Sequence, residues 1–320
     1  MSGNADNYET ALKTSSSETV AAFSERKGAL ARVQHALHVT PALVPLFVLV
    51  VSIVIFGLLL GSKFFSPFAL TLILQQVQIV GIVAAAQSLV ILTAGIDLSV
   101  GAIAVLSSVI MGQFTFRYGL PVEVAVAAGL VFGTLIGSIN GWLIAVMKLP
   151  PFIVTLGMWQ IVLAANFLYS KNATIRSQDI EAEAPLLQFL GTTFKIGADV
   201  DGRGGASFTY GVIAMVLIFV ILSYVLSQTA WGRHVYAVGD DAEAAQLSGV
   251  NVKATLISVY AVTGFICAIA GWALIGRIGS VSPTSGQLLN IESITAVVIG
   301  GISLFGGLSL IHISEPTRLV

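Results

Sequence analysis

Long segments without a single charged side chain constrain this sequence more than any other feature. A bilayer core about 30 Å thick is crossed by about 20 apolar residues in a helix, and an unpaired charge inside it is costly. The helices of a large soluble core would instead carry charged outer faces. Eight stretches lack Asp, Glu, Lys and Arg, and each predicts a transmembrane span: Pro41–Gly61, Leu70–Thr93, Gly101–Phe116, Val124–Met147, Pro150–Tyr169, Tyr210–Gln228, Ala254–Gly276 and Ser293–Ile311.

The composition of the whole chain agrees with this interpretation. Of its 320 residues 56% are hydrophobic and only 10% are charged, whereas a soluble domain carries about 25% charged residues. The mean hydropathy of +0.93 excludes a disordered chain, and the formal net charge of −1 argues against a nucleic-acid partner. Cys267 is the single cysteine, which excludes a disulfide framework or a cysteine metal site within the chain. The predicted fold class is an all-α polytopic integral membrane protein.

The charges that do occur set the expected domain plan and orientation. Residues 1–40 form a polar tail without the features of a secretory signal, and a transmembrane domain over residues 41–311 follows it. Arg26, Lys27 and Arg32 precede the first span and only Lys63 follows it, so the positive-inside rule places the N-terminus in the cytoplasm. If every candidate crosses, residues 170–209 form an outer loop and residues 229–253 a cytoplasmic loop.

A carboxylate interrupts the apolar sequence between the second and third spans, within the segment Gly95–Gly101. One interpretation is that Gly95 ends a helix and that Asp97 or Ser99 caps the next one, satisfying amide groups that lipid cannot. The other is that Asp97 lies at a broken helix that lines a translocation route, as ionisable residues within membranes often do. Both roles can coexist, and Gly101 belongs to the same break.

A related pattern follows 206 residues later, where Gly301–Gly307 matches Gly95–Gly101 at four of seven positions. Repeated halves with interrupted helices are typical of transporters whose pathway lies between the halves. The sequence therefore predicts an internal repeat, although the match does not distinguish a parallel from an inverted one.

Small and amide-bearing residues mark contacts between helices. Gly133, Gly137 and Gly141 recur every four residues and so share one helix face, which predicts a close packing contact with a neighbouring helix. Asn140 lies beside this face and is expected to bond across helices or to face a wet cavity. The second span also carries several glutamines, which we expect to face protein or water: Gln75, Gln76, Gln78 and Gln87.

The cytoplasmic loop contains the segment Asp240–Gly249, which predicts a short helix that begins with an acidic cap and ends at glycine. On composition alone a plain connecting helix would explain it. The chain has no phosphate-binding Gly-rich loop, no His-Glu-x-x-His and no Gly-x-Ser-x-Gly element. We therefore expect no catalytic residue, no bound metal and no ATP hydrolysis on this chain.

Several ordered motifs together carry a family resemblance. They are LTAGIDLSVGAI from Leu92, GxxxGxxNGW from Gly133, PPFIVTLGMW from Pro150, GRHVYAVGDDAEAA from Gly232 and GGISLFGG from Gly300. With these motifs the chain resembles the membrane permease subunit of bacterial ABC importers for monosaccharides, the ribose, xylose, arabinose and fructose group, and within it most resembles fructose permeases of alphaproteobacteria. The resemblance covers about residues 41–307.

This resemblance implies partners and a role for the cytoplasmic loop. It implies an inner-membrane permease that pairs with a second copy, a cytoplasmic ATPase that binds ATP and Mg²⁺, and a periplasmic sugar-binding protein. The loop matches the Glu-Ala-Ala-x-x-x-Gly core of the coupling segment that seats in the ATPase, but lacks the later Leu-Pro of that motif. The implied coupling residues are Asp240, Asp241, Glu243, Ala244, Ala245 and Gly249.

Two further expectations concern mechanism and length. The main rival to an ABC importer is a secondary sugar transporter driven by an ion gradient, with Asp97 as its ion site. The resemblance also implies about ten spans rather than eight, and the last residues, 312–320, resemble translated vector sequence. On this interpretation the chain is truncated at its C-terminus and assembles poorly.

Overall fold

The computed structural model describes residues 43–196 and 206–302, which form helices apart from one small hairpin. The elements are α3 (Leu43–Leu60), η1 (Gly61–Lys63), α4 (Pro67–Leu92), α5 (Val100–Tyr118), α6 (Val122–Ala145), α7 (Pro151–Ser170), α8 (Ser177–Glu183), η2 (Pro185–Gly191), β1 (Thr193–Ile196), β2 (Ala206–Thr209), α9 (Tyr210–Gln228), α10 (Ala230–Asp240), α11 (Ala242–Leu247), α12 (Val252–Ile278) and α13 (Leu289–Ile299).

Within this described part of the chain, seven helices are long and apolar enough to cross a membrane: α3, α4, α5, α6, α7, α9 and α12. They coincide with the first seven predicted spans, so the prediction of an all-α polytopic fold is confirmed. The eighth candidate, Ser293–Ile311, overlaps the shorter helix α13, and its second half lies outside the described residues, as do the N-terminal tail and residues 312–320.

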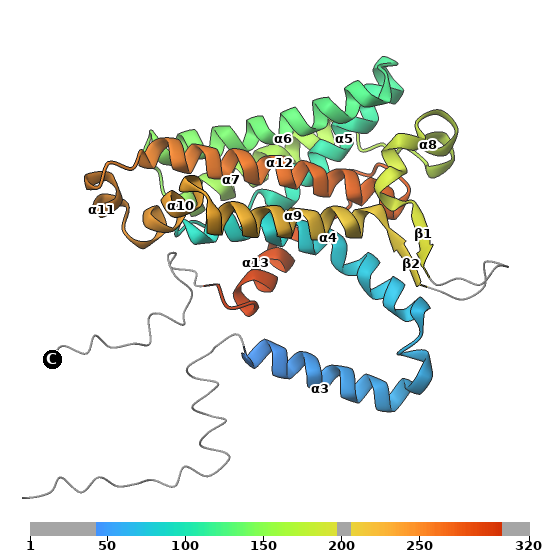
Figure 1. The fold of residues 1–320 in the computed structure, drawn as a ribbon. Helices are drawn as coiled ribbons and strands as arrows, with labels where there is room; N and C mark the ends of the chain where they lie inside the picture. The colour runs from blue at the N-terminus through green and yellow to red at the C-terminus, as the bar shows by residue number, and fades with distance from the viewer. Residues whose placement is uncertain (1–42, 197–205, 303–320) are drawn as a thin grey trace, which may run out of the picture. The chain divides into compact units, whose positions relative to one another are not determined.

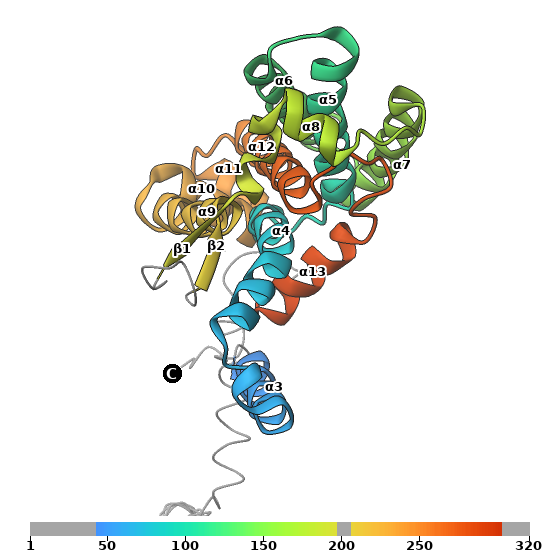
Figure 2. The ribbon, with the colours of Figure 1, turned by 90° about the vertical axis from the view of Figure 1, so that its right-hand side faces the viewer.

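Helix α12 lies at the centre of the bundle, with α4, α5 and α6 packed around it (Figure 2). It and α5 are the most buried of the long helices, whereas the side chains of α3 described here are mostly exposed. An apolar helix with so much exposed surface requires lipid or another protein surface to cover it.

Close packing of α6 on α12 depends on glycine. A methyl group at Gly133 would lie 2.7 Å from the carbonyl O of Gly264, and one at Gly141 would lie 2.8 Å from the Cα of Ile257. Gly137 lies between them, directly against the backbone at Tyr260. The three glycines thus face α12 and let the two backbones approach more closely than any larger side chain would allow.

The two ends of the bundle carry different elements (Figure 1). One end carries α10 and α11. The other carries α8, η2 and the antiparallel hairpin of β1 and β2, in which Phe194 is paired with Phe208. This hairpin was not predicted. It lies against the start of α4, because the backbone N–H of Ser207 donates to Thr71 Oγ1 at 2.9 Å.

Candidate functional site

The connection between α4 and α5 is a helix break held inside the bundle. Helix α4 ends at Leu92, and the chain turns at Ala94, whose φ of 58° lies in the left-handed region. The Ala94 N–H donates to Ile91 O and the Gly95 N–H to Val90 O, a paired arrangement that satisfies the last carbonyls of a helix.

The expectation that Gly95 ends the helix is therefore wrong by one residue, since Ala94 adopts the left-handed conformation. Gly95 is needed for space. A methyl group there would lie 2.8 Å from the Tyr260 hydroxyl and 3.0 Å from a methyl of Val90.

Asp97 organises the start of α5. It is completely buried, and its Oδ1 accepts hydrogen bonds from the Ser99 N–H at 2.7 Å and from the Ser99 hydroxyl at 2.6 Å. Ser99 occupies the capping position of α5, but its hydroxyl makes no capping bond to the helix. Of the two residues considered as a cap, Asp97 is thus the one whose side chain binds the backbone at this helix start.

Side chains from α6, α7 and α4 itself hold the same break. Asn140 on α6 donates to Ser99 Oγ at 2.9 Å, so it bonds across helices, and Thr155 on α7 donates to Ile96 O at 3.0 Å. The amide of Gln87 on α4 lies 3.0 Å from the carbonyl O of Asp97 and 3.2 Å from its N, so it can donate and accept at once. The sequence offered no sign that Thr155 or Tyr260 belongs to this cluster.

The cluster is not fully satisfied. Asp97 Oδ2, Asn140 Oδ1 and the Tyr260 hydroxyl are buried and have no hydrogen-bond partner. Buried polar atoms in folded proteins are nearly always paired, because leaving one unpaired costs about 1–3 kcal/mol. The break therefore contains unpaired polar atoms that would gain hydrogen bonds in a different arrangement of these helices or with a bound molecule.

Gly101, the last residue of the predicted break, brings α5 close to α13. A methyl group at Gly101 would lie 3.1 Å from the backbone N of Asn290 and 3.2 Å from the Cβ of Leu289. The Asn290 side chain in turn donates to Leu98 O at 3.4 Å, a long hydrogen bond. The break is thus in contact with the start of α13.

Helix α13 ends in the same way as α4. Gly301 has a φ of 94°, and the N–H groups of Gly301 and Ile302 donate to the carbonyls of Val298 and Val297. This is the same helix ending as at α4, with Gly301 in the place of Ala94. The sequence match had aligned Gly301 with Gly95, and the remainder of the second segment lies outside the described residues.

The segment Asp240–Gly249 contains α11, a short helix capped at both ends. Asp241 Oδ1 accepts from the N–H groups of Glu243 and Ala244 at 2.8 and 3.0 Å. At the other end Gly249 has a φ of 89°. Its N–H donates to Gln246 O and the Val250 N–H donates to Ala245 O, which is the same pair of hydrogen bonds that ends α4.

Helix α11 is exposed on most of its surface. Of its residues only Ala245 is buried, while Asp240, Asp241, Glu243, Ala244 and Gly249 are exposed. Leu247 is 90% exposed, the most exposed large apolar side chain in the described part of the chain. Beside α11 lies a hollow of about 640 Å³, lined also by the turn between α6 and α7, with Lys148 and Lys253 on its wall.

Helix α10 connects this exposed helix to the centre of the bundle. It packs against α9, α4 and α12. The indole N–H of Trp231 on α10 donates to Ser258 Oγ on α12 at 2.8 Å. Ser258 precedes Tyr260 by two residues, so α12 joins the surface at α11 to the break at Asp97.

No three potential metal-ligating side chains gather in the described ranges.

A family model described as the branched-chain amino acid transport system / permease component matches residues 69–310. The chain belongs to this permease family. It is 67% identical over 300 residues to the fructose import permease protein of Rhizobium meliloti, covering 94% of the chain and 81% of that protein. It is 33% identical to the ribose import permease protein of Haemophilus influenzae, covering 82% of the chain and 77% of the relative.

A third relative is the xylose transport system permease protein of Escherichia coli, 33% identical over 281 residues that cover 73% of the chain and 72% of the relative. No solved structure matched the chain. The sequence-based identification as a permease of this group is therefore confirmed at the level of the family, and the permease is a transport subunit rather than an enzyme.

Proposed function

We propose that this chain is the transmembrane subunit of an ABC importer that moves a monosaccharide, fructose or ribose or a similar sugar, across the bacterial inner membrane. ATP and Mg²⁺ bind to a separate ATPase, and a periplasmic sugar-binding protein delivers the sugar. The observation that carries the proposal is the doubly capped, exposed helix α11, which matches the Glu-Ala-Ala-x-x-x-Gly pattern.

The geometry of α11 suits a docking element. A short helix with satisfied ends keeps its shape without packing partners on its outer face. Leu247 is almost fully exposed and gives that face an apolar contact, which a partner groove would bury. The basic residues of the adjacent hollow, Lys148 and Lys253, add charge that an acidic rim on the ATPase would complement.

The packing provides a route by which ATPase closure reaches the membrane interior. Movement of α11 is transmitted to α10, and α10 is bonded to α12 through Trp231 and Ser258. Helix α12 carries Tyr260, whose unpaired hydroxyl lies beside the break. Two arrangements of this break, with different partners for its buried polar atoms, would serve as inward-open and outward-open states.

The orientation follows from the same proposal. ATP is cytoplasmic, so α11 faces the cytoplasm and the hairpin end faces the periplasm, where the sugar-binding protein docks. Helix α4 begins at the hairpin end, since Ser207 bonds to Thr71. If α3 crosses the membrane, the N-terminus is then cytoplasmic. Lipid or the second permease copy covers the exposed face of α3.

The alternative is a secondary transporter that binds an ion at Asp97. The unpaired Oδ2 of this buried carboxylate is the observation in its favour. Against it, the other oxygen already holds Ser99 through two hydrogen bonds, which is what a structural cap requires.

The proposal is tested by measuring how well variants of α11 couple the permease to its ATPase. Gly249→Val forces a branched side chain into a left-handed position and should deform α11, and Glu243→Lys reverses a charge on its exposed face. We expect both variants to insert normally but to lose copurification with the ATPase or sugar-stimulated ATP hydrolysis. Gly119→Val is the matched control, because Gly119 is also left-handed, with φ of 65°, but lies at the C-terminus of α5. Unchanged coupling in both α11 variants would contradict the proposal.

A further inference from the structure

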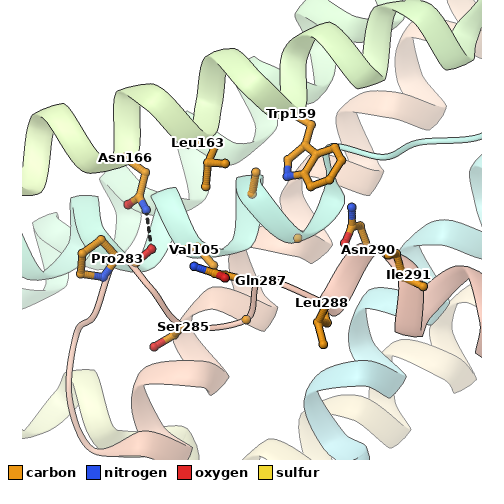
Figure 3. Close-up of a pocket in the computed structure, with 13 residues that line it drawn as sticks. Val105, Trp159, Leu163, Asn166, Pro283, Ser285, Gln287, Leu288, Asn290 and Ile291 are labelled. Atoms are coloured by element: carbon orange, nitrogen blue, oxygen red, sulfur yellow. Dashed lines mark hydrogen bonds between the residues drawn. The ribbon is translucent and has the colours of Figure 1, made fainter. Parts of the chain in front are cut away.

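A cavity beside the break at Asp97 lies between α5, α7, the segment before α13 and α13 itself (Figure 3). Its volume is about 250 Å³, several times the ~30 Å³ that one water occupies in the liquid. Pockets for drug-sized ligands have volumes of roughly 300–1,000 Å³, so this slightly smaller cavity has the size for a molecule with a single small ring.

The wall on α7 follows from helical spacing. Trp159, Leu163 and Asn166 are four and three residues apart, so they share one face of the helix. Figure 3 shows all three pointing toward the space above Gln287. On the α5 side the wall is built of small residues, Gly101 and Ala102, and of Val105, which leaves room beside the indole ring of Trp159.

Two amide oxygens in this wall have no partner. Asn166 is 1% exposed and its Nδ2 donates to Pro283 O at 2.8 Å, while Asn290 is 2% exposed and its Nδ2 donates to Leu98 O. In each residue the amide NH₂ donates to a backbone carbonyl, over a long distance at Asn290, and Oδ1 is buried without a hydrogen-bond partner. A ligand that satisfies both oxygens must supply hydrogen-bond donors.

The residues that line the cavity also disfavour a charged ligand. None of the 13 residues that line the cavity is Asp, Glu, Lys, Arg or His. An amino acid would bring an ammonium and a carboxylate into this space without counter-charges, which is strongly unfavourable. A neutral molecule with several hydroxyl groups meets both requirements, since its hydroxyls donate to the amide oxygens and its C–H face packs on the indole ring of Trp159.

We infer that this cavity binds a neutral polyhydroxylated molecule, and, resting on the proposed function, that it is the site where the permease itself contacts its monosaccharide during transport. Asn166 and Asn290 accept hydrogen bonds from sugar hydroxyls, and Trp159 packs against the sugar ring. Although the family model is described by branched-chain amino acids, the chemistry of this cavity assigns the chain to sugars.

Site-directed labelling tests occupancy directly. Ser285 lines the cavity, whereas the neighbouring Thr284 is exposed and does not. In the full permease, Ser285→Cys and Thr284→Cys are labelled with N-ethylmaleimide in the presence of D-fructose, D-ribose or L-leucine, each up to about 100 mM. The native Cys267 is completely buried and should not react.

We expect fructose or ribose to slow labelling at position 285 several-fold and to leave position 284 unchanged, while leucine protects neither. Adding Asn166→Leu to Ser285→Cys should weaken protection about tenfold in sugar concentration, the effect of losing one hydrogen bond in a closed site. Gln160→Leu is the matched control, because it removes an exposed amide from the same helix outside the cavity. Protection by leucine, or no protection by either sugar, would overturn the inference.

A parallel uptake assay keeps the two proposals apart. Vesicles that contain the permease, its ATPase and its binding protein are assayed for ATP-driven uptake of the same sugars. If the unmodified assembly moves no sugar, the proposed function fails, while protection at position 285 would still support the cavity. If it moves sugar and Asn166→Leu and Asn290→Leu both do so at the unmodified rate, the proposed function stands and the cavity assignment fails.

Discussion

Oδ1 of Asp97 accepts both the backbone N–H and the hydroxyl of Ser99, so one carboxylate oxygen fixes the start of a membrane helix. An amide oxygen in the same place can accept the same bonds. We therefore expect Asp97→Asn to retain most of the ATP-driven uptake of the assembled importer. Asp97→Ala should lower stability by about 1–3 kcal/mol, because it leaves the Ser99 N–H buried and unpaired.

Uptake and thermal stability in detergent measure the two effects. The rival ion-coupled mechanism makes the opposite prediction for Asp97→Asn, because an amide carries no charge to bind a cation or a proton. Complete loss of transport in Asp97→Asn, with normal folding, would favour that rival.

Gly137 lies directly against the backbone of α12 at Tyr260. Gly137→Val forces α6 away from α12, and we expect a loss of about 1–3 kcal/mol, as for other overpacked interiors. Gly157 on α7 is the control, because a methyl group there meets no atom within 4 Å. Gly157→Ala should be neutral or stabilise the helix by up to about 1 kcal/mol. Thermal unfolding followed by gel filtration compares the pair, and equal effects would show that the contact contributes nothing.

The hydrogen bond from Trp231 to Ser258 links α10 to α12. Ser258→Ala should leave ATPase binding intact but lower the number of sugar molecules moved per ATP hydrolysed, because the transmitting contact loses about 0.5–1.5 kcal/mol. Ser227→Ala removes a hydroxyl that bonds only within α9 and serves as control. An unchanged transport ratio in Ser258→Ala would show that this bond transmits no movement.

Leu247 offers an apolar contact at the tip of the molecule. We expect Leu247→Asp to reduce copurification of the ATPase about tenfold or more, as the loss of a well-buried interface residue commonly does. The same change at Thr193, exposed on β1 at the opposite end, should have no such effect. Full retention of the ATPase by Leu247→Asp would exclude α11 as the main contact.

The sequence predicted the elements whose signals are local. The absence of charge located the seven long helices, and the acidic residues from Asp240 and the glycine at Gly249 marked the two ends of α11, because caps and left-handed glycines act on their immediate neighbours. The packing face of α6 was predicted from the spacing of its glycines, although the partner helix was not.

The structure was needed for contacts between distant residues. Asn166 donates a hydrogen bond to Pro283, which lies 117 residues later in the sequence. The sequence patterns of α7 and α13 do not predict that their asparagines line the same cavity. The turn at Ala94 was placed at Gly95, because glycine is the usual left-handed residue, whereas here Gly95 provides space beside Tyr260.

In the proposed mechanism, ATP hydrolysis on a partner drives sugar through this permease. The most direct measurement is uptake of radiolabelled fructose or ribose into vesicles that contain the permease, the ATPase and the binding protein, with ATP supplied and ion gradients collapsed by ionophores. We expect uptake that requires ATP, survives the ionophores and ceases without the ATPase. Uptake by the permease alone, driven by an imposed ion gradient without ATP, would contradict it.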